Sequence, residues 1–170
     1  MRKWKDIYYA LRSEYYQRIK YKRKANIKLG SHFRIEGSNL DCRGGVLSIG
    51  NNFFMNSGGS IVCRYSISIG DNVIIGENVH LYDHNHCFKD LLKPISQQGY
   101  KYGEIMIGNN VWLCSNVIIL PNVHIGDNCV IGAGCIISDN VPSNSIVRVN
   151  QEQIIQKIIN DNSEQISNNN

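Results

Sequence analysis

The sequence predicts an all-β protein built as a parallel β-helix, in which the chain turns a corner every six residues. From Ile107 onward it reads IGNNVW, LCSNVI, ILPNVH, IGDNCV, IGAGCI and ISDNVP, with an aliphatic residue opening every hexad. A period of six fits neither the 3.6-residue turn of an α-helix nor the alternation of a long strand. It fits a triangular coil of about eighteen residues whose three faces each point aliphatic side chains inward.

The same rhythm is present upstream. Earlier hexads begin at Ile49, Met55, Ile61, Ile69, Ile75 and Leu81. A two-residue slip at Ile67-Ser68 interrupts them, and LGSHFR from Leu29 indicates an irregular first coil. Asn51-Asn52 and Asp71-Asn72 fall where a corner needs positive φ or a side-chain hydrogen bond to the backbone. We therefore expect about five coils over residues 27–149.

The two ends of the chain depart from the repeat. Residues 1–24 carry nine Lys and Arg against two acidic residues, with apolar residues recurring among them. Their helical spacing predicts an amphipathic helix over residues 1–26, which packs on the prism or contacts an anionic membrane through residues 1–24. Residues 150–170 are expected to form a short helix with one isoleucine face, followed by a disordered polar tail.

Size and composition narrow the function classes. The 170 residues suffice for one domain with a sizeable core. No apolar run approaches twenty residues and no signal-peptide pattern is present, so we expect a cytoplasmic protein, placed at the inner face of a membrane if residues 1–24 bind one. No base-reading motif accompanies the basic segment, which argues against nucleic-acid binding. The six cysteines lack CxxC spacing, and Cys129 and Cys135 are expected to be buried thiols.

The repeat breaks once, after Leu81. The chain then reads YDHNH, and residues 87–104 follow no pattern until the hexads resume at Ile105–Ile107. A loop of this length in a compact domain is usually functional or disordered, and Asp83, His84 and His86 stand at its root. Three ligands so close in sequence are badly placed for a tetrahedral metal site, so no metal is expected. A neutral imidazole beside a carboxylate is suited to accepting a proton instead.

These residues resemble the hexapeptide-repeat acyltransferases over residues 29–149. The stretch VHLYDHNH, with IGNNVW after the loop, resembles the branch that holds maltose, galactoside and polysaccharide O-acetyltransferases. The resemblance implies a left-handed parallel β-helix and a homotrimer with active sites between subunits. An ungapped alignment places the catalytic histidine on His86, with His84 as the reserve candidate. Asp83 is the local carboxylate that would orient the imidazole.

The resemblance also implies an acetyl-CoA-dependent O-acetyltransferase that acts on a sugar hydroxyl in surface-polysaccharide (capsule or lipopolysaccharide) biosynthesis. The residues expected to bind the acceptor are Asn56, Tyr82 and Trp112. Those expected to bind the cofactor are Ser115, Ala133, Ser138 and Arg148. The sequence departs from the family pattern at Asp139, where relatives have a lysine, and Arg148 or Lys157 would then be the substitute partner for the CoA phosphate.

Several alternatives stay open at this stage. The acceptor could instead be a xenobiotic or an amino sugar, and Cys87, which adjoins His86, could act as a thiolate nucleophile. A non-catalytic β-helix scaffold would need neither histidine. An enzyme resembling the γ-carbonic anhydrases would need three separated histidines to hold a metal.

Overall fold

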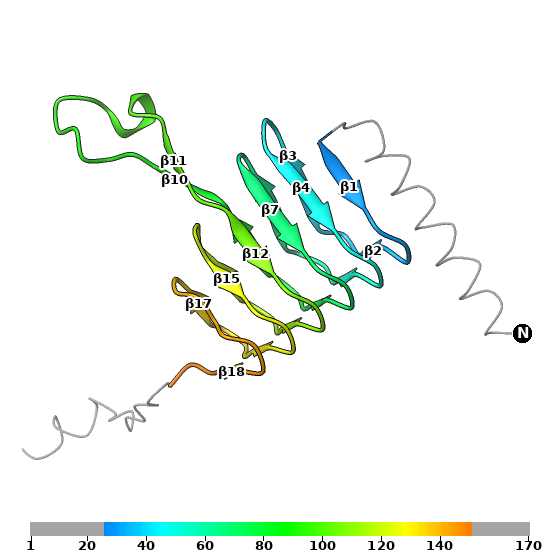
Figure 1. Cartoon of the computed structure of the whole chain (residues 1–170). Coiled ribbons are helices and arrows are strands. Elements are labelled where there is room, and N and C mark those ends of the chain that lie inside the picture. The colour runs from blue at the N-terminus through cyan, green and yellow to red at the C-terminus, as the bar shows by residue number, and fades with distance from the viewer. Residues whose placement is uncertain (1–25, 151–170) are drawn as a thin grey trace, which may run out of the picture.

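The computed structural model describes residues 26–150 and shows a triangular prism of stacked coils (Figure 1). The predicted terminal helices fall almost entirely on residues 1–25 and 151–170, outside the described part. Within residues 26–150, no helix is long and apolar enough to cross a membrane.

Three parallel sheets form the faces of the prism. Sheet A contains β1 (Ile27–Leu29), β4 (Val46–Ile49), β7 (Ser66–Ile69), β12 (Ile105–Ile107) and β15 (His124–Ile125). Sheet B contains β2 (Arg34–Ile35), β5 (Phe54–Met55), β8 (Ile74–Ile75), β13 (Trp112–Leu113), β16 (Val130–Ile131) and β18 (Ile146–Val147). Sheet C contains β3 (Asn39–Cys42), β6 (Ser60–Cys63), β9 (His80–Tyr82), β14 (Ile118–Ile119) and β17 (Ile136–Ile137). Each coil thus supplies one strand to each sheet, and the predicted all-β fold is confirmed.

The prism holds five complete coils, and a sixth, partial coil contributes β18 and a bridge from Val141 to Ile125. Aliphatic ladders fill its interior, as the hexad pattern predicts. The hexad-opening residues that line it are Ile107, Leu113, Ile119, Ile125, Ile131 and Ile137, all at most 5% exposed. Cys129 and Cys135 are also buried, as predicted.

Coil length differs between the two halves of the prism. The C-terminal coils step by eighteen residues, for example from Trp112 to Val130, as the hexads predict. The N-terminal coils step by twenty, for example from Leu47 to Ile67, which agrees with the two-residue slip in the hexads. Ile67 is buried and paired in register, which places the two extra residues at the corner Arg64-Tyr65.

Asparagine makes the corners possible. Asn52, Asn72, Asn110 and Asn128 adopt φ between 54° and 58°, the left-handed region that asparagine tolerates better than most residues. Their side chains also bond along the prism: Asn110 Nδ2 donates to Asn128 Oδ1 at 2.9 Å. The predicted corner role of these residues is confirmed.

One excursion leaves the prism after sheet C in the third coil (green in Figure 1). It is an antiparallel hairpin of β10 (His84–His86) and β11 (Tyr100–Tyr102), capped by a loop that contains the short 3-10 helix η1 (Ile95–Gln97). His84 pairs with Tyr102 and His86 with Tyr100. The break in the hexads is therefore an ordered hairpin, rooted at the corner between sheets C and A.

Candidate active site

Asp83 lies at the root of the hairpin, inside the prism. Cys42 and Cys63 occupy the same inward position in the two preceding coils, so a carboxylate stands where the pattern otherwise buries a thiol. Asp83 is fully buried, and among the described residues it is the only buried polar or charged one. This carboxylate also contributes, after burial and the Cys42 thiol, to raising the pKa of the Cys63 thiol.

Hydrogen bonds compensate the burial of the Asp83 carboxylate. Arg64 N donates to both carboxylate oxygens at 2.9 Å, and Tyr65 N donates to Oδ2 at 2.7 Å. These two amides belong to the extended corner of the coil before. A buried carboxylate with several donors is stable, whereas one without them is costly. Asp83 therefore holds the corner of one coil to the start of the hairpin in the next.

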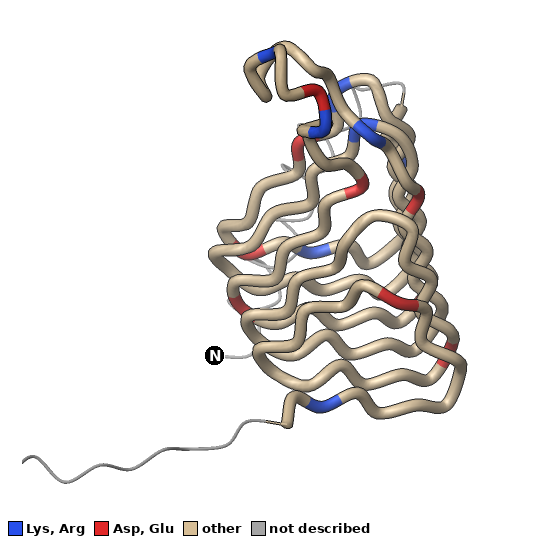
Figure 2. Tube along the Cα trace, turned by 90° about the vertical axis from the view of Figure 1, so that its left-hand side faces the viewer, with Lys and Arg blue, Asp and Glu red and all other residues tan. Residues whose placement is uncertain are grey.

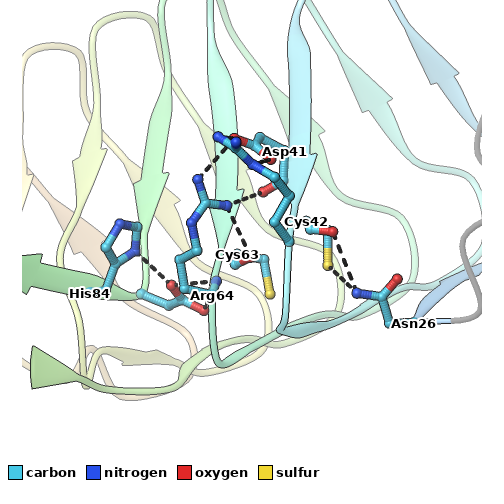
Figure 3. Close-up of polar contacts among 8 residues, drawn as sticks. Asn26, Asp41, Cys42, Cys63, Arg64 and His84 are labelled. Carbon is cyan, nitrogen blue, oxygen red and sulfur yellow. Dashed lines mark hydrogen bonds and ion pairs between the residues drawn. The ribbon is translucent and has the colours of Figure 1, made fainter. Parts of the chain in front are cut away.

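The remaining Asp83 contact is with a histidine. Asp83 Oδ1 lies 3.0 Å from Nδ1 of His84, whose side chain is only 14% exposed (Figure 3). With a proton on Nδ1 to donate to the carboxylate, the neutral ring carries its lone pair on Nε2. The carboxylate expected to orient the catalytic histidine thus contacts His84, the reserve candidate, and not His86.

His86 is exposed and packs against a tyrosine. Its ring centroid lies 4.5 Å from that of Tyr100, and Tyr100 in turn meets His84 edge-on at 5.4 Å. Tyr102 lies 6.3 Å from Tyr100 and 6.4 Å from Tyr65. The two histidines and three tyrosines form one aromatic cluster on the hairpin strands and the adjoining corner.

The hexad pattern gives no indication of these tyrosines. Tyr100 and Tyr102 lie in the stretch that follows no hexad pattern, and Tyr65 lies in the extended corner. One signal was available: YKY has the same alternation as HNH, which is what two paired strands facing one cluster require. Recognising the hairpin would have placed these residues beside the histidines.

An ion-pair group borders the aromatic cluster. Asp41 on β3 accepts from Arg64 Nη2 at 2.9 Å and from Arg43 Nη2 at 2.8 Å (Figure 3). These hydrogen bonds, with Arg64 the stronger contributor, hold the pKa of Asp41 well below its usual range. The same contact raises the pKa of Arg43, with a smaller contribution from nearby Tyr100. The border therefore stays charged at neutral pH.

A cavity of about 630 Å³ opens on the outer part of the hairpin. His86 and Cys87 line it at the root, Phe88 contributes an apolar side chain, and Lys89, Lys93 and Lys101 contribute positive charge. Its volume is within the usual range for small-molecule sites, about 300–1,000 Å³.

The other residues predicted for the site lie elsewhere on the prism. The corner column between sheets B and C contains Asn56 and Arg148 directly after their sheet B strands, and Ser115 and Ala133 one residue further along theirs. Asn56 Oδ1 accepts from Ser57 N within that corner. Arg148 Cγ lies 3.8 Å from the position that a Cβ on Gly132 would take, so its side chain runs along the Ala133 corner.

Three predicted residues lie outside that column. Tyr82 ends β9 on sheet C, between the column and the histidines. Ser138 follows sheet C two coils beyond the hairpin and donates to Asp139 Oδ2 at 2.9 Å. Trp112 is half exposed on sheet B, the face opposite the corner that bears the histidines. A single chain therefore brings together Tyr82, Asp83, His84 and His86, but not Trp112 or the column.

No group of three or more His, Cys, Asp and Glu side chains suited to a metal ion exists within residues 26–150. None of the six cysteines is in a disulfide. The cavity and the histidines thus offer acid–base groups and hydrogen-bonding groups.

Comparison with known proteins places this arrangement in a family. Residues 104–139 match the bacterial transferase hexapeptide (six repeats) model. A maltose O-acetyltransferase from Clostridium difficile 630 is similar at 32% identity, with a TM-score of 0.63, over 79% of this chain and 72% of that one. The chain belongs to the hexapeptide-repeat acyltransferases.

Within that family the similarity is to sugar O-acetyltransferases. A galactoside acetyltransferase solved with coenzyme A is 38% identical, with a TM-score of 0.64, over 70% of this chain and 58% of that one. The galactoside O-acetyltransferase of Escherichia coli (strain K12) is 40% identical over 77 residues, which are 42% of this chain and 34% of that protein. The chain thus spans about a third of that curated relative.

Proposed function

We propose that this protein is an acetyl-CoA-dependent O-acetyltransferase that acts on a sugar hydroxyl, with His86 as the general base. The similarity to galactoside and maltose O-acetyltransferases supports the reaction class. The observation that carries the proposal is the ordered hairpin, which holds two histidines beside a cavity at the one break in the repeat.

Accessibility supports His86 as the base. A general base must come within hydrogen-bond reach of the proton it removes, so geometry is the first criterion. His86 is exposed and lines the cavity, whereas the His84 side chain is 14% exposed and bound to Asp83. We assign His84 as a positioning residue: Asp83 fixes His84, His84 packs on Tyr100, and Tyr100 packs on His86.

The proposed reaction needs one general base and an activated acetyl group. Acetyl-CoA supplies an activated acyl group as a thioester. The acceptor hydroxyl has a pKa far above neutrality, so neutral His86 takes its proton as the oxygen attacks the thioester carbonyl carbon. The C–S bond then breaks, and the CoA thiolate leaves and takes up the proton from His86. Such a base contributes about 10²- to 10⁴-fold in rate.

The corner column supports binding of the cofactor. Ser115 and Ala133 present backbone groups on successive coils, and Arg148 adds a cation on the next. This is a suitable arrangement for an extended arm that ends in phosphate, because arginine pairs well with phosphate oxygens. The solved galactoside acetyltransferase holds coenzyme A.

A homotrimer would complete the site. Phe54, Ile74, Trp112, Val130 and Ile146 lie in register along the outer face of sheet B. Ile74, Trp112 and Ile146 are 50–61% exposed, and an apolar stripe of this kind favours burial against another surface. Because sheet B lies opposite the histidine corner, Trp112 can reach a histidine only from a second copy. We propose that each site lies between two copies.

The biological setting is proposed from the family resemblance and from the charge of residues 1–24. The resemblance favours surface-polysaccharide biosynthesis, and the basic residues 1–24 suit a cytoplasmic protein beside an anionic membrane. Vesicle co-sedimentation of the full chain with and without anionic lipid tests the membrane contact; equal binding to both would contradict it.

Two measurements test the proposed activity. Titration calorimetry with acetyl-CoA should show binding, and a thiol-release assay over a panel of sugars should show transfer to at least one. Absence of acetyl-CoA binding at millimolar concentration would favour the scaffold alternative. Transfer to amino sugars alone would favour N-acetylation.

A further inference from the structure

Basic side chains gather around the hairpin. Residues 26–150 contain eight Lys and Arg. Five of them lie on the hairpin or at the corner beneath it: Arg43, Arg64, Lys89, Lys93 and Lys101. Figure 2 shows Lys and Arg (blue) gathered at the edge of the prism from which the hairpin leaves.

Nearby carboxylates neutralise only part of this charge. Asp41 is engaged by both corner arginines, and Asp90 lies 3.4 Å from the Lys93 ammonium. Asp83 is buried against backbone amides and His84. This leaves Lys89 and Lys101 without an acidic partner within residues 26–150, and both line the cavity beside His86.

The loop that carries Lys89 is held in place by internal hydrogen bonds. The Gln98 amide accepts from Asp90 N at 3.0 Å and donates to the carbonyls of Asp90 and Lys93, each at 2.8 Å. Cys87 N donates to Gly99 O at 3.0 Å, which closes the loop at its base. These hydrogen bonds fix the backbone of the loop that lines the cavity and carries Lys89.

We propose that the acceptor is an anionic sugar, bearing a carboxylate or a phosphate. The anion lies against Lys89 and Lys101 while a hydroxyl of the same molecule faces His86. This inference rests on the proposed function and goes beyond it, since galactosides and maltose are neutral. Two cations in one partly enclosed cavity favour a negative ligand group, because a neutral sugar would leave both charges unmatched.

The acceptor test compares matched sugars: methyl glucoside, methyl glucuronide and glucose 6-phosphate. We expect kcat/KM to be at least about tenfold higher for one of the anionic sugars, and the preference to weaken as salt is raised from about 0.05 M to 0.5 M. The two anionic sugars distinguish a carboxylate from a phosphate.

The residue test uses the double variant Lys89→Met/Lys101→Met, with Lys28→Met on β1 as the matched control. If each lysine contributes as a typical partly exposed ion pair, the double variant raises KM for the anionic sugar roughly five- to twentyfold. KM for methyl glucoside and for acetyl-CoA should not change, and Lys28→Met should behave as the unmodified protein.

The remaining outcomes of these tests contradict either this inference or the proposed function. Equal turnover of neutral and anionic sugars, with no effect of the double variant, overturns this inference and leaves the proposed function standing. A raised KM for acetyl-CoA alone means that the lysines bind the CoA phosphates, which also overturns it. If no sugar is acetylated, the proposed function fails. The anionic site is then tested by calorimetry of glucose 6-phosphate and glucuronate with the unmodified protein and the double variant. Equal binding to both proteins, or no binding, overturns the anionic site.

Discussion

Replacing Asp83 with asparagine tests the structural role of the buried carboxylate. Asparagine keeps one oxygen, which can still accept from Arg64 N and Tyr65 N. Its NH₂ group then faces Nδ1 of His84, so the 3.0 Å contact is lost or the ring must change tautomer. Hydrogen bonds to a charged group contribute about 1.5–3 kcal/mol each, so we expect Asp83→Asn to destabilise the fold by about 2–4 kcal/mol.

The assay is thermal or urea unfolding, with Asp127→Asn as the control. Asp127 also accepts a corner amide, Asn109 N at 2.6 Å, but it is exposed and contacts no histidine. We expect the control to lose less than about 1 kcal/mol. Asp83 has no such structural role if Asp83→Asn is as stable as the unmodified protein, or if the two variants lose the same free energy of unfolding.

Three further predictions concern other parts of the molecule. Burial raises the pKa of the Cys63 thiol. Under native conditions a thiol reagent should therefore modify the partly exposed Cys87 at least about tenfold faster than Cys63. Mass spectrometry that finds Cys63 modified first would contradict this prediction. Asp41 has a lowered pKa, so its stabilisation is present above the ordinary value of 3.8 and is lost as pH falls below it. Asp41→Asn should cost about 0.5–1 kcal/mol at pH 6, with the difference shrinking at lower pH, and an unfolding difference that grows on acidification would be inconsistent with the ion pairs. Trp112→Asp should disrupt the proposed trimer in light scattering while leaving the monomer folded by circular dichroism; an intact trimer would remove sheet B from the interface.

The repeat could be predicted well because it is a local pattern. A buried aliphatic residue at the start of each hexad follows directly from a corner every six residues, and the six hexad-opening residues from Ile107 onward lie in the core as expected. The asparagine corners were predictable for the same reason, since few other residues tolerate positive φ.

The site could be predicted only in part. His84 and His86 were identifiable because they stand where the repeat stops. The contact partner of Asp83 was not identifiable, because whether a side chain at an irregular corner points inward or outward depends on tertiary pairing. The hexad periodicity gave no structure for residues 87–104, whereas in the structure β11, which contains Tyr100, pairs with β10, which contains the two histidines. The sequence pattern assigned the two extra residues to Ile67-Ser68, whereas the structure has them at the corner Arg64-Tyr65. The pattern gives the number of extra residues but not which residues form the corner.

In the proposed mechanism His86 removes the acceptor proton, and His84 positions His86. The most direct test is kcat for His86→Ala and His84→Ala, each checked for fold by circular dichroism and for acetyl-CoA binding by calorimetry. We predict that His86→Ala lowers kcat by about 10²- to 10⁴-fold with acetyl-CoA binding retained. His84→Ala should lower kcat by a smaller factor and reduce stability. Near-normal turnover by His86→Ala, with loss of turnover in His84→Ala, would contradict the assignment and make His84 the base.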